Sequence, residues 1–367
     1  MNEPWAAARR LLVMRLDNIG DVVMAGPVLR ALKENLPGSY VTLMASPGGS
    51  KAAPLLPWLD EVLSWRVLWQ DLGRLSFDPA REWEMIETLK RGSYDAAIIL
   101  TSFKQTPHAA GYACYLAGIP FRLGESKEWG GGVLTDEAPT APDELHQTER
   151  NLRLIEQAGF RIKDRALSIR VPEGAYKAGA ELLKMRGVVP DAPYLLLSPW
   201  TSTQARTYET DRFALVARRL SEETGWPVVV SGTKGDQERS GRLLDTLGNR
   251  SVDLIGATDL GVLAALIEGA RLVLTNNTST MHLADALCAP SVVLYSGTEL
   301  ESQWRPRSAP HRLLRRETWC SPCYAFTCPY DLECLDVPPE EVVGAGLSLL
   351  REVGDEAAKA PRRRSRA

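Results

Sequence analysis

The sequence predicts an α/β protein built from two doubly wound domains, and three observations lead to this fold class. The chain has 367 residues, which is more than one hydrophobic core usually covers. Short apolar runs typical of buried strands alternate with helical stretches, a pattern that indicates parallel sheets between layers of helices. This alternation occurs twice, on either side of a proline-containing segment at 172–193. We therefore expect two Rossmann-like units.

The expected elements follow in chain order. The first series of strands covers 11–16, 41–45 and 96–100, and it alternates with helices that include 82–91 and 146–157. The second series of strands covers 194–197, 228–230, 252–255, 272–274 and 292–294. Between the two series, prolines flank a further helix, which places the domain boundary in this region.

These signals divide the chain into three parts. Residues 1–172 form the expected N-terminal domain and residues 173–353 the expected C-terminal domain. Residues 354–367 carry a basic run that is expected to be disordered and solvated. The facing carboxyl edges of the two sheets would form a central cleft, where open α/β sheets bind ligands.

A polar turn follows the expected strand at 272–274 and leads into a helix. Its residues are Asn276, Asn277, Thr278, Ser279 and Thr280, with His282 in the first turn of the helix. The N–H groups at a helix start carry the positive end of the helix dipole, and hydroxyl groups add donors that suit phosphate. The turn therefore predicts a site for a nucleotide-linked substrate. The alternative is that Thr278 or Ser279 only caps the helix.

A related strand, turn and helix lie near the N-terminus. Gly20 is expected to permit the tight turn and Asp21 to open the helix. A carboxylate at this position already occupies the pole that attracts anions, so this turn is less suited to phosphate than the other, and Asp21 is a candidate base. A base that accepts its proton late, from a hydroxyl attacking a cationic sugar centre, depends more on position than on basicity. The alternative is that Asp21 only stabilises the helix start.

The two turns together resemble glycosyltransferase family nine, the heptosyltransferases of bacterial lipopolysaccharide synthesis, over most of residues 10–350. Residues 15–32 look like the first strand and first helix of that family, and Asp21 matches its catalytic aspartate. Residues 146–152 resemble the segment before the interdomain connection.

The C-terminal half continues the resemblance. Residues 198–208 look like the first donor-side loop of the family, with Arg206 at the position of a phosphate-binding cation. Residues 254–287 complete the match to the donor half. The resemblance implies donor-binding roles for Ser198, Thr201, Arg206, Asn276, Asn277, Thr278, Ser279, Thr280 and His282.

The resemblance also implies the architecture and the reaction. The fold would be GT-B, with acceptor bound by the N-terminal domain and donor by the C-terminal domain. The reaction would be inverting transfer of a heptose or related sugar, with ADP-heptose as the expected donor and a lipopolysaccharide-core-like or other glycan as acceptor. No Asp-x-Asp sequence stands where a divalent cation would bridge the diphosphate, and the family is metal-independent, so we expect neither a metal nor a cofactor.

One departure from the family pattern concerns the donor turn. The usual Asp-Thr-Gly is Asn277-Thr278-Ser279 in this chain. An amide keeps hydrogen bonding to the donor sugar, removes a negative charge and adds donors. The departure affects the expected donor more than the expected type of reaction.

Acceptor binding is expected to use arginines of the N-terminal domain. If the acceptor carries phosphates or carboxylates, Arg66, Arg74, Arg122 and Arg150 are candidate contacts, because a guanidinium binds such groups in bidentate fashion. Ordinary ion pairs at the protein surface are the alternative explanation for these arginines.

Composition excludes several classes of protein. The formal net charge of −3 does not favour a nucleic-acid partner, and no G-x-G-x-x-G follows the first strand to bind a nicotinamide or flavin dinucleotide. The sequence has no long apolar span and its start does not resemble a secretory signal, so we expect a cytoplasmic protein. A lipid-linked acceptor would require peripheral contact with the inner membrane, and the basic run at 362–366 is a candidate aid.

Four of the six cysteines crowd into residues 320–334: Cys320, Cys323, Cys328 and Cys334. Their spacing is tighter than that of paired zinc knuckles, and a reducing cytoplasm opposes disulfides. Zinc binding, disulfides and reduced thiols all remain open. Similar cysteine-rich loops occur in many members of the family, which implies a shared structural role.

Two other functions fit parts of the pattern. One is a nucleotide-sugar epimerase on the same architecture, although the Asp21 turn favours transfer. The other is a non-catalytic binding protein for sugar nucleotides or metal, in which the cysteine-rich loop is the sensor and Asp21 is only a helix acid.

Overall fold

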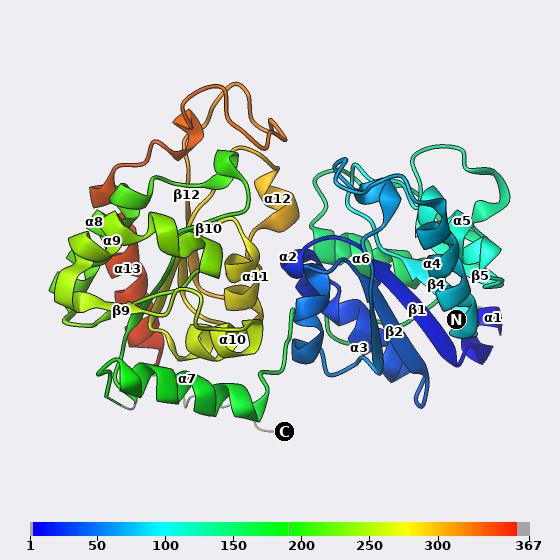
Figure 1. Ribbon diagram of the computed structural model, residues 1–367, viewed down its shortest axis with the longest axis horizontal. Helices are drawn as coiled ribbons and strands as arrows, with labels where there is room; N and C mark the ends of the chain where they lie inside the picture. Colours follow the sequence, from blue (N-terminus) through cyan, green and yellow to red (C-terminus); the bar gives the residue numbers. More distant parts are fainter. Residues whose placement is uncertain (1–2, 190, 358–367) are drawn as a thin grey trace. The chain divides into compact units, whose positions relative to one another are not determined.

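The computed structural model describes residues 3–189 and 191–357, and it divides into two compact units, Met1–Arg170 and Val171–Ala367. Each unit contains one six-stranded sheet in its described residues, and every strand pairs in parallel with its neighbours. The predicted fold class, α/β with two doubly wound parallel sheets, is confirmed (Figure 1).

The N-terminal unit has the strand order β3-β2-β1-β4-β5-β6. Its strands are β1 Arg10–Arg15, β2 Tyr40–Ala45, β3 Glu61–Ser64, β4 Ala96–Ile99, β5 Phe121–Glu125 and β6 Asp136–Ala138. Its helices are α1 Glu3–Ala7, α2 Ile19–Met24, α3 Gly26–Asn35, α4 Pro79–Arg91, α5 His108–Leu116 and α6 Gln147–Gln157.

Alternate residues of the central strand β1 supply the two cores of this unit. Leu12 and Met14 pack with apolar residues of α4 and α5 on one face of the sheet. Leu11 and Val13 point to the opposite face and are also fully buried. Burial on both faces explains why β1 reads as a continuous apolar run.

Helix α4 illustrates how local sequence fixes an element. Asp78 accepts hydrogen bonds from the N–H groups of Ala80 and Arg81, and Pro79 occupies the first position, where a missing N–H costs nothing. Lys90 and Arg91 in the last turn complement the negative end of the helix dipole.

The C-terminal unit has the strand order β12-β11-β10-β7-β8-β9. Its strands are β7 Leu195–Ser198, β8 Val228–Val230, β9 Ser251–Asp253, β10 Leu272–Asn276, β11 Ser291–Leu294 and β12 His311–Leu314. Its helices are α7 Glu173–Met185, α8 Thr210–Thr224, α9 Gly241–Leu247, α10 Leu260–Gly269, α11 Ser279–Ala286, α12 Glu301–Trp304 and α13 Pro339–Ala357.

The helices of this unit also form two layers. Helix α8 contacts both α9 and α13, and these three cover the core beneath Leu197, Leu274 and Leu294. Helix α10 contacts α7 and α11, which form the other layer. Figure 1 shows α13 in red beside α8, and α13 also contacts β11 and β12 of the sheet.

The C-terminal end of the chain differs from the expected boundaries. Helix α13 continues to Ala357, so residues 354–357, expected as tail, are helical. The basic run at 362–366 lies outside the described residues.

Within the described residues, none of the helices combines the length and the apolar character that crossing a bilayer requires.

Candidate active site

The candidate residues gather at the topological switch point of each sheet. In the N-terminal unit the chain builds β1, β2 and β3 outward and then returns to place β4 on the other side of β1. In the C-terminal unit β10 returns in the same way to lie beside β7. Ligands of open α/β sheets bind at the carboxyl ends of the strands at such points. Asp21 follows β1, whereas Asn276 ends β10 next to Ser198 at the end of β7.

The start of α2 differs from the expectation at two positions. The helix begins at Ile19, with Asn18 as its N-cap residue, so Gly20 lies inside the helix and Asp21 is its third residue. Asp21 Oδ2 accepts a hydrogen bond from the Asn18 N–H at 3.2 Å. This is the acid half of a capping box, a pattern that the sequence interpretation overlooked. Asp21 therefore does stabilise the helix start, through one of its two oxygens.

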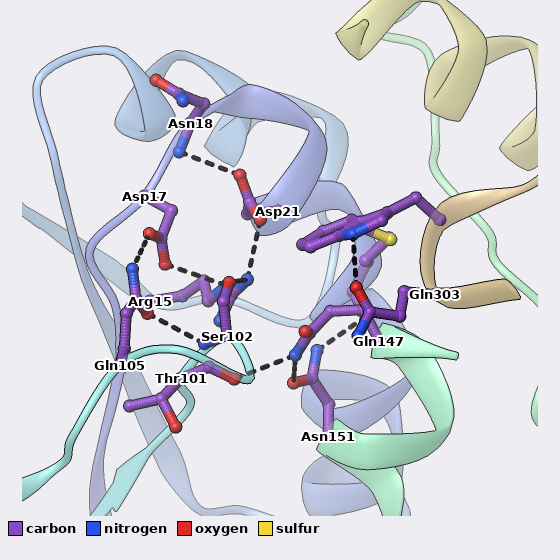
Figure 2. A network of polar contacts seen from close by, with 12 residues as sticks. Arg15, Asp17, Asn18, Asp21, Thr101, Ser102, Gln105, Gln147, Asn151 and Gln303 are labelled. Carbon is purple, nitrogen blue, oxygen red and sulfur yellow. Dashed lines mark hydrogen bonds and ion pairs between the residues drawn. The ribbon is translucent and has the colours of Figure 1, made fainter. Parts of the chain in front are cut away.

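The other oxygen of Asp21 contacts a buried cation. Arg15 Nη2 lies 2.7 Å from Asp21 Oδ1, and Arg15 Nε lies 3.3 Å from Asp17 Oδ2. The Arg15 side chain is fully buried, and it also donates to Ser102 Oγ at 2.9 Å. Burial lowers the pKa of Arg15, but the two carboxylates outweigh it and raise that pKa above its usual value. We call Arg15, Asp17, Asp21, Ser102 and Gln105 the Asp21 cluster (Figure 2).

Asp17 is the second carboxylate of this cluster. Burial raises its pKa, against the opposing effect of the Arg15 charge. Gln105 Nε2 donates to Asp17 Oδ1 at 2.5 Å, and the Ser102 N–H donates to Gln105 Oε1 at 2.8 Å. The loop that follows β4 thereby holds Asp17 from the side away from α2.

A layer of amides supports the cluster from α6. Gln147 donates to the Thr101 carbonyl at 3.0 Å and to Asn151 Oδ1 at 2.9 Å, and Asn151 donates to the Met24 carbonyl at 3.3 Å (Figure 2). These bonds join α6 to the end of β4 and to α2. The elements that carry the Asp21 cluster, α2 and the segment after β4, are therefore both hydrogen-bonded to α6.

The donor turn, residues Asn276 to Thr280, begins α11. Thr278 occupies the N-cap position, but its side chain makes no capping hydrogen bond and instead lies 3.4 Å from Thr275 Oγ1. The hydroxyl of Thr278 therefore does not satisfy the first-turn N–H groups of α11. The capping alternative fails for Thr278.

The two asparagines of the turn have different surroundings. Asn276 is fully buried, accepts from the Tyr208 N–H at 3.0 Å and donates to the Pro199 carbonyl at 2.7 Å, which joins β10 to the loop after β7. Asn277 Oδ1 accepts from the Ser296 N–H at 3.2 Å. Its Nδ2 is buried without a hydrogen-bond partner within residues 3–189 and 191–357. An unsatisfied buried donor costs about 1–3 kcal/mol, which a bound acceptor group would recover.

The remaining residues of the candidate donor site lie in and around this turn. Ser198 Oγ lies 3.1 Å from Thr280 Oγ1, and Thr201 Oγ1 lies 2.8 Å from Thr207 Oγ1. His282 is buried on α11, with its ring 6.4 Å from the ring of Trp304 in an edge-on arrangement.

Arg206 ends a short 3₁₀ turn, Gln204–Arg206, after β7. Its Nη2 lies 2.7 Å from Glu299 Oε1, and its Nε is buried without a hydrogen-bond partner in the described part of the chain. The side chain is 30% exposed. Glu299 was not identified from the sequence, because the pair is separated by 93 positions and no local pattern records it.

The four arginines proposed for the acceptor fall into two groups. Arg122 donates to the carbonyls of Ile119, Pro120 and Val133, and Arg150 forms a buried ion pair with Glu125. These two guanidinium groups hold their own unit together, whereas Arg66 and Arg74 are exposed in the segment between β3 and α4. Acceptor binding by Arg66, Arg122 and Arg150 remains a prediction.

The cysteine-rich loop encloses a small pocket in the C-terminal unit. Cys320, Cys323, Cys328 and Cys334 all line it and all are free thiols. Cys328 Sγ accepts a hydrogen bond from the Tyr330 N–H at 3.4 Å. Among the residues the structure describes, no three His, Cys, Asp or Glu side chains are grouped as a metal site.

The sequence matches a family of known proteins. Residues 82–333 match the model of glycosyltransferase family 9 (heptosyltransferase). The chain is 26% identical to lipopolysaccharide heptosyltransferase 2 of Salmonella typhimurium over 358 residues, which are 94% of this chain and 99% of that protein. It is 26% identical to lipopolysaccharide heptosyltransferase 1 of Pseudomonas aeruginosa over 330 residues, 88% of each protein.

Solved structures share the fold. A family 9 glycosyl transferase from Veillonella parvula superposes with a TM-score of 0.76 at 20% identity, covering 94% of this chain and 97% of that one. The E. coli ADP-heptose lps heptosyltransferase II superposes with a TM-score of 0.72 at 23% identity, covering 94% and 99%. These neighbours confirm the predicted GT-B architecture. The family match spans more than half of the sequence, and the chain belongs to glycosyltransferase family 9.

Proposed function

We propose that this glycosyltransferase moves a heptose from ADP-heptose, with inversion, to a hydroxyl of a lipopolysaccharide-core-like acceptor. The observation that carries the proposal is Asp21, a partly exposed carboxylate at the switch point of the N-terminal sheet, held through Oδ1 by Arg15 and through Oδ2 by Asn18. The chain matches two lipopolysaccharide heptosyltransferases over 88% and 99% of their length, and this supports the choice of sugar and acceptor.

The proposed step is a single displacement. The acceptor oxygen forms a bond to the anomeric carbon while the bond from that carbon to the diphosphate oxygen breaks. The proton of the acceptor hydroxyl passes to Asp21, and the electron pair of the broken bond leaves with ADP. A single carboxylate base suits this one-step reaction. The Asp21 side chain is 16% exposed, so it is accessible to an acceptor hydroxyl, which supports its use as that base.

In the absence of a metal ion, the negative charge of the leaving diphosphate must be stabilised by a cationic side chain and hydrogen-bond donors of the protein. Arg206 supplies positive charge, and the start of α11 supplies N–H and hydroxyl groups around Thr278 and Thr280. Asn277 Nδ2, buried without a partner among the described residues, is available to a sugar hydroxyl. We propose that the reaction is metal-independent on the strength of this donor set.

The acceptor sets the cellular location that we propose. A lipopolysaccharide precursor is lipid-linked, so the protein would work in the cytoplasm, in peripheral contact with the inner membrane. Nucleic acid has no part in this reaction.

The proposal is tested by offering the purified protein ADP-, GDP-, UDP- and dTDP-sugars, including ADP-heptose. Calorimetry measures binding, and mass spectrometry of the products follows transfer to a heptose-deficient core acceptor. Selective ADP-heptose binding with formation of a glycoside is the expected result. Isomerised sugar nucleotide without glycoside would indicate an epimerase, and binding without any turnover would indicate a binding protein. Either outcome would overturn the proposal.

Arg206→Ala is expected to weaken ADP-heptose binding by about 10-fold or more, since a charged hydrogen bond contributes about 1.5–3 kcal/mol. Glu299→Gln is expected to strengthen binding, because Glu299 competes with the diphosphate for Arg206. Arg212→Ala is the matched control, since Arg212 pairs with Asp336 at an exposed position. Calorimetric dissociation constants for the three variants check the prediction, and equal effects of Arg206→Ala and Arg212→Ala would contradict it.

Asn277→Asp is expected to increase the preference for ADP-heptose, the usual family donor, over the other sugar nucleotides. The substitution keeps an acceptor for the Ser296 N–H and replaces the unpartnered amide nitrogen with a carboxylate oxygen. Ratios of kcat/KM across the panel of sugar nucleotides measure the shift. An unchanged ranking of donors would remove Asn277 as a determinant of specificity.

A further inference from the structure

We infer that Arg15 is a positioning residue for Asp21, which it holds in the orientation that accepts the acceptor proton. The inference rests on the proposed function of Asp21 as the base. It assigns Arg15 a role in turnover in addition to its role in the core.

Geometry supplies the first argument. Arg15 is the last residue of β1, so its backbone is fixed by pairing with Ala45 of β2. From there its guanidinium reaches two carboxylates with different nitrogens, Nη2 to Asp21 and Nε to Asp17. The planar guanidinium fork is also held by Ser102, because Nη2 donates to Ser102 Oγ at 2.9 Å, and this fixes the direction as well as the distance of the Asp21 contact. The Asp21 carboxylate therefore has its rotation set by Arg15 on one oxygen and by the Asn18 N–H on the other.

Burial supplies the second argument. The Arg15 side chain has no exposed surface, whereas the side chains of Asp17 and Asp21 are 15% and 16% exposed. A buried ion pair is costly, and replacing all of its charged residues by apolar residues of similar volume is often as stable. A simple core position at the end of β1 would not need a charge. The charge is explained if it serves the carboxylate that remains accessible.

The orientation has a consequence for catalysis. A misplacement of about 1 Å in a reacting group can cost about 100-fold in rate. Without Arg15, the Asp21 carboxylate would keep only its capping bond to the Asn18 N–H, and its other oxygen would no longer be held in place. Arg15→Gln is therefore expected to lower kcat by about 10- to 100-fold with little change in the KM for donor or acceptor.

A double-mutant cycle with Asp21→Asn tests this inference. In the Asp21→Asn background, Arg15→Gln is expected to lower kcat by less than about twofold further, because the group it positions is already inactive. Arg15→Lys should recover part of the native rate, since an ammonium keeps the charge without the fork. Full additivity of the two losses in kcat would overturn the inference.

Two further variants separate positioning from folding. Arg15→Gln leaves Asp17 without its cation, so Arg15→Gln/Asp17→Asn, which removes both charges, is expected to fold more stably and still lose kcat. Arg10→Gln is the matched control at the other end of β1, where Arg10 donates to the Gly92 carbonyl at 2.8 Å. Its kcat should stay within about twofold of native. Equal losses in Arg10→Gln and Arg15→Gln would contradict the inference.

The outcome stays distinguishable from failure of the proposed function. If the native protein transfers no heptose, the proposed function fails. The Arg15–Asp21 contact is then tested by urea unfolding of the native protein, Arg15→Gln, Asp21→Asn and the double variant. Non-additive shifts of the unfolding midpoint would support the contact that the inference requires. Additive shifts would overturn it.

Discussion

Asp21→Asn is expected to lower kcat for heptosyl transfer by about 1000-fold, within the range that general base catalysis contributes. The amide oxygen of asparagine can still accept a hydrogen bond from Arg15 or from the Asn18 N–H, so α2 should remain folded. Donor binding should change by less than about threefold, because the groups proposed to bind the donor belong to the C-terminal unit. Steady-state kinetics and calorimetry of the variant measure the two quantities.

Asp78→Asn is the matched control for this substitution. Asp78 also stands at the start of a helix, α4, where it accepts from backbone N–H groups. If Asp21 is only a helix acid, the two substitutions should have similarly small effects on kcat. Near-native turnover of Asp21→Asn would remove Asp21 as the base.

Arg150→Met is expected to lower the free energy of unfolding of the N-terminal unit by about 3–5 kcal/mol, the typical effect of stranding one partner of a buried ion pair. The side chains of Arg150 and Glu125 are only 5% and 6% exposed, so the Glu125 charge would be left in the interior. Urea unfolding of the variant and the native protein measures this loss.

The partner substitution provides the control. Arg150→Met/Glu125→Leu is expected to regain most of the lost stability, since it removes both charges together. A large rise in the acceptor KM of the stable double variant would assign Arg150 to acceptor binding as well. A stability loss below about 1 kcal/mol in Arg150→Met would contradict the structural role.

All interior strands except β5 could be predicted, because parallel strands buried on both faces are continuous apolar runs. The strands β3, β5, β6 and β12 were not predicted. Three of them, β3, β6 and β12, are edge strands, whose side chains are mostly only partly buried, as in Glu61–Ser64 and His311–Leu314. In β5 the buried charges Arg122 and Glu125 break the apolar pattern. Apolar runs in the sequence reveal strands that are buried along their whole length. They do not reveal strands in which buried and exposed, or apolar and charged, residues follow one another.

Only some residues of the candidate site could be found from the sequence. Asp21 and the donor turn carry local signals, since each is a polar turn between a strand and a helix. Gln105 carries none, because its contact with Asp17 spans 88 positions, and the contact of Arg15 with Ser102 spans 87 positions. The start of α2 was misplaced because the capping role of Asn18 was not recognised. Side-chain networks of this kind need the fold before they can be read.

The Asp21 cluster also determines how charge moves during the proposed reaction. With both carboxylates ionised, Arg15, Asp17 and Asp21 carry a net charge of −1, which falls to zero when Asp21 accepts the proton. In the same step the leaving diphosphate gains one negative charge at the donor site that we propose on the C-terminal sheet. Each turnover thus shifts one unit of negative charge from the N-terminal to the C-terminal unit. The 16% of the Asp21 side chain that remains exposed gives the proton a route back to solvent before the next cycle.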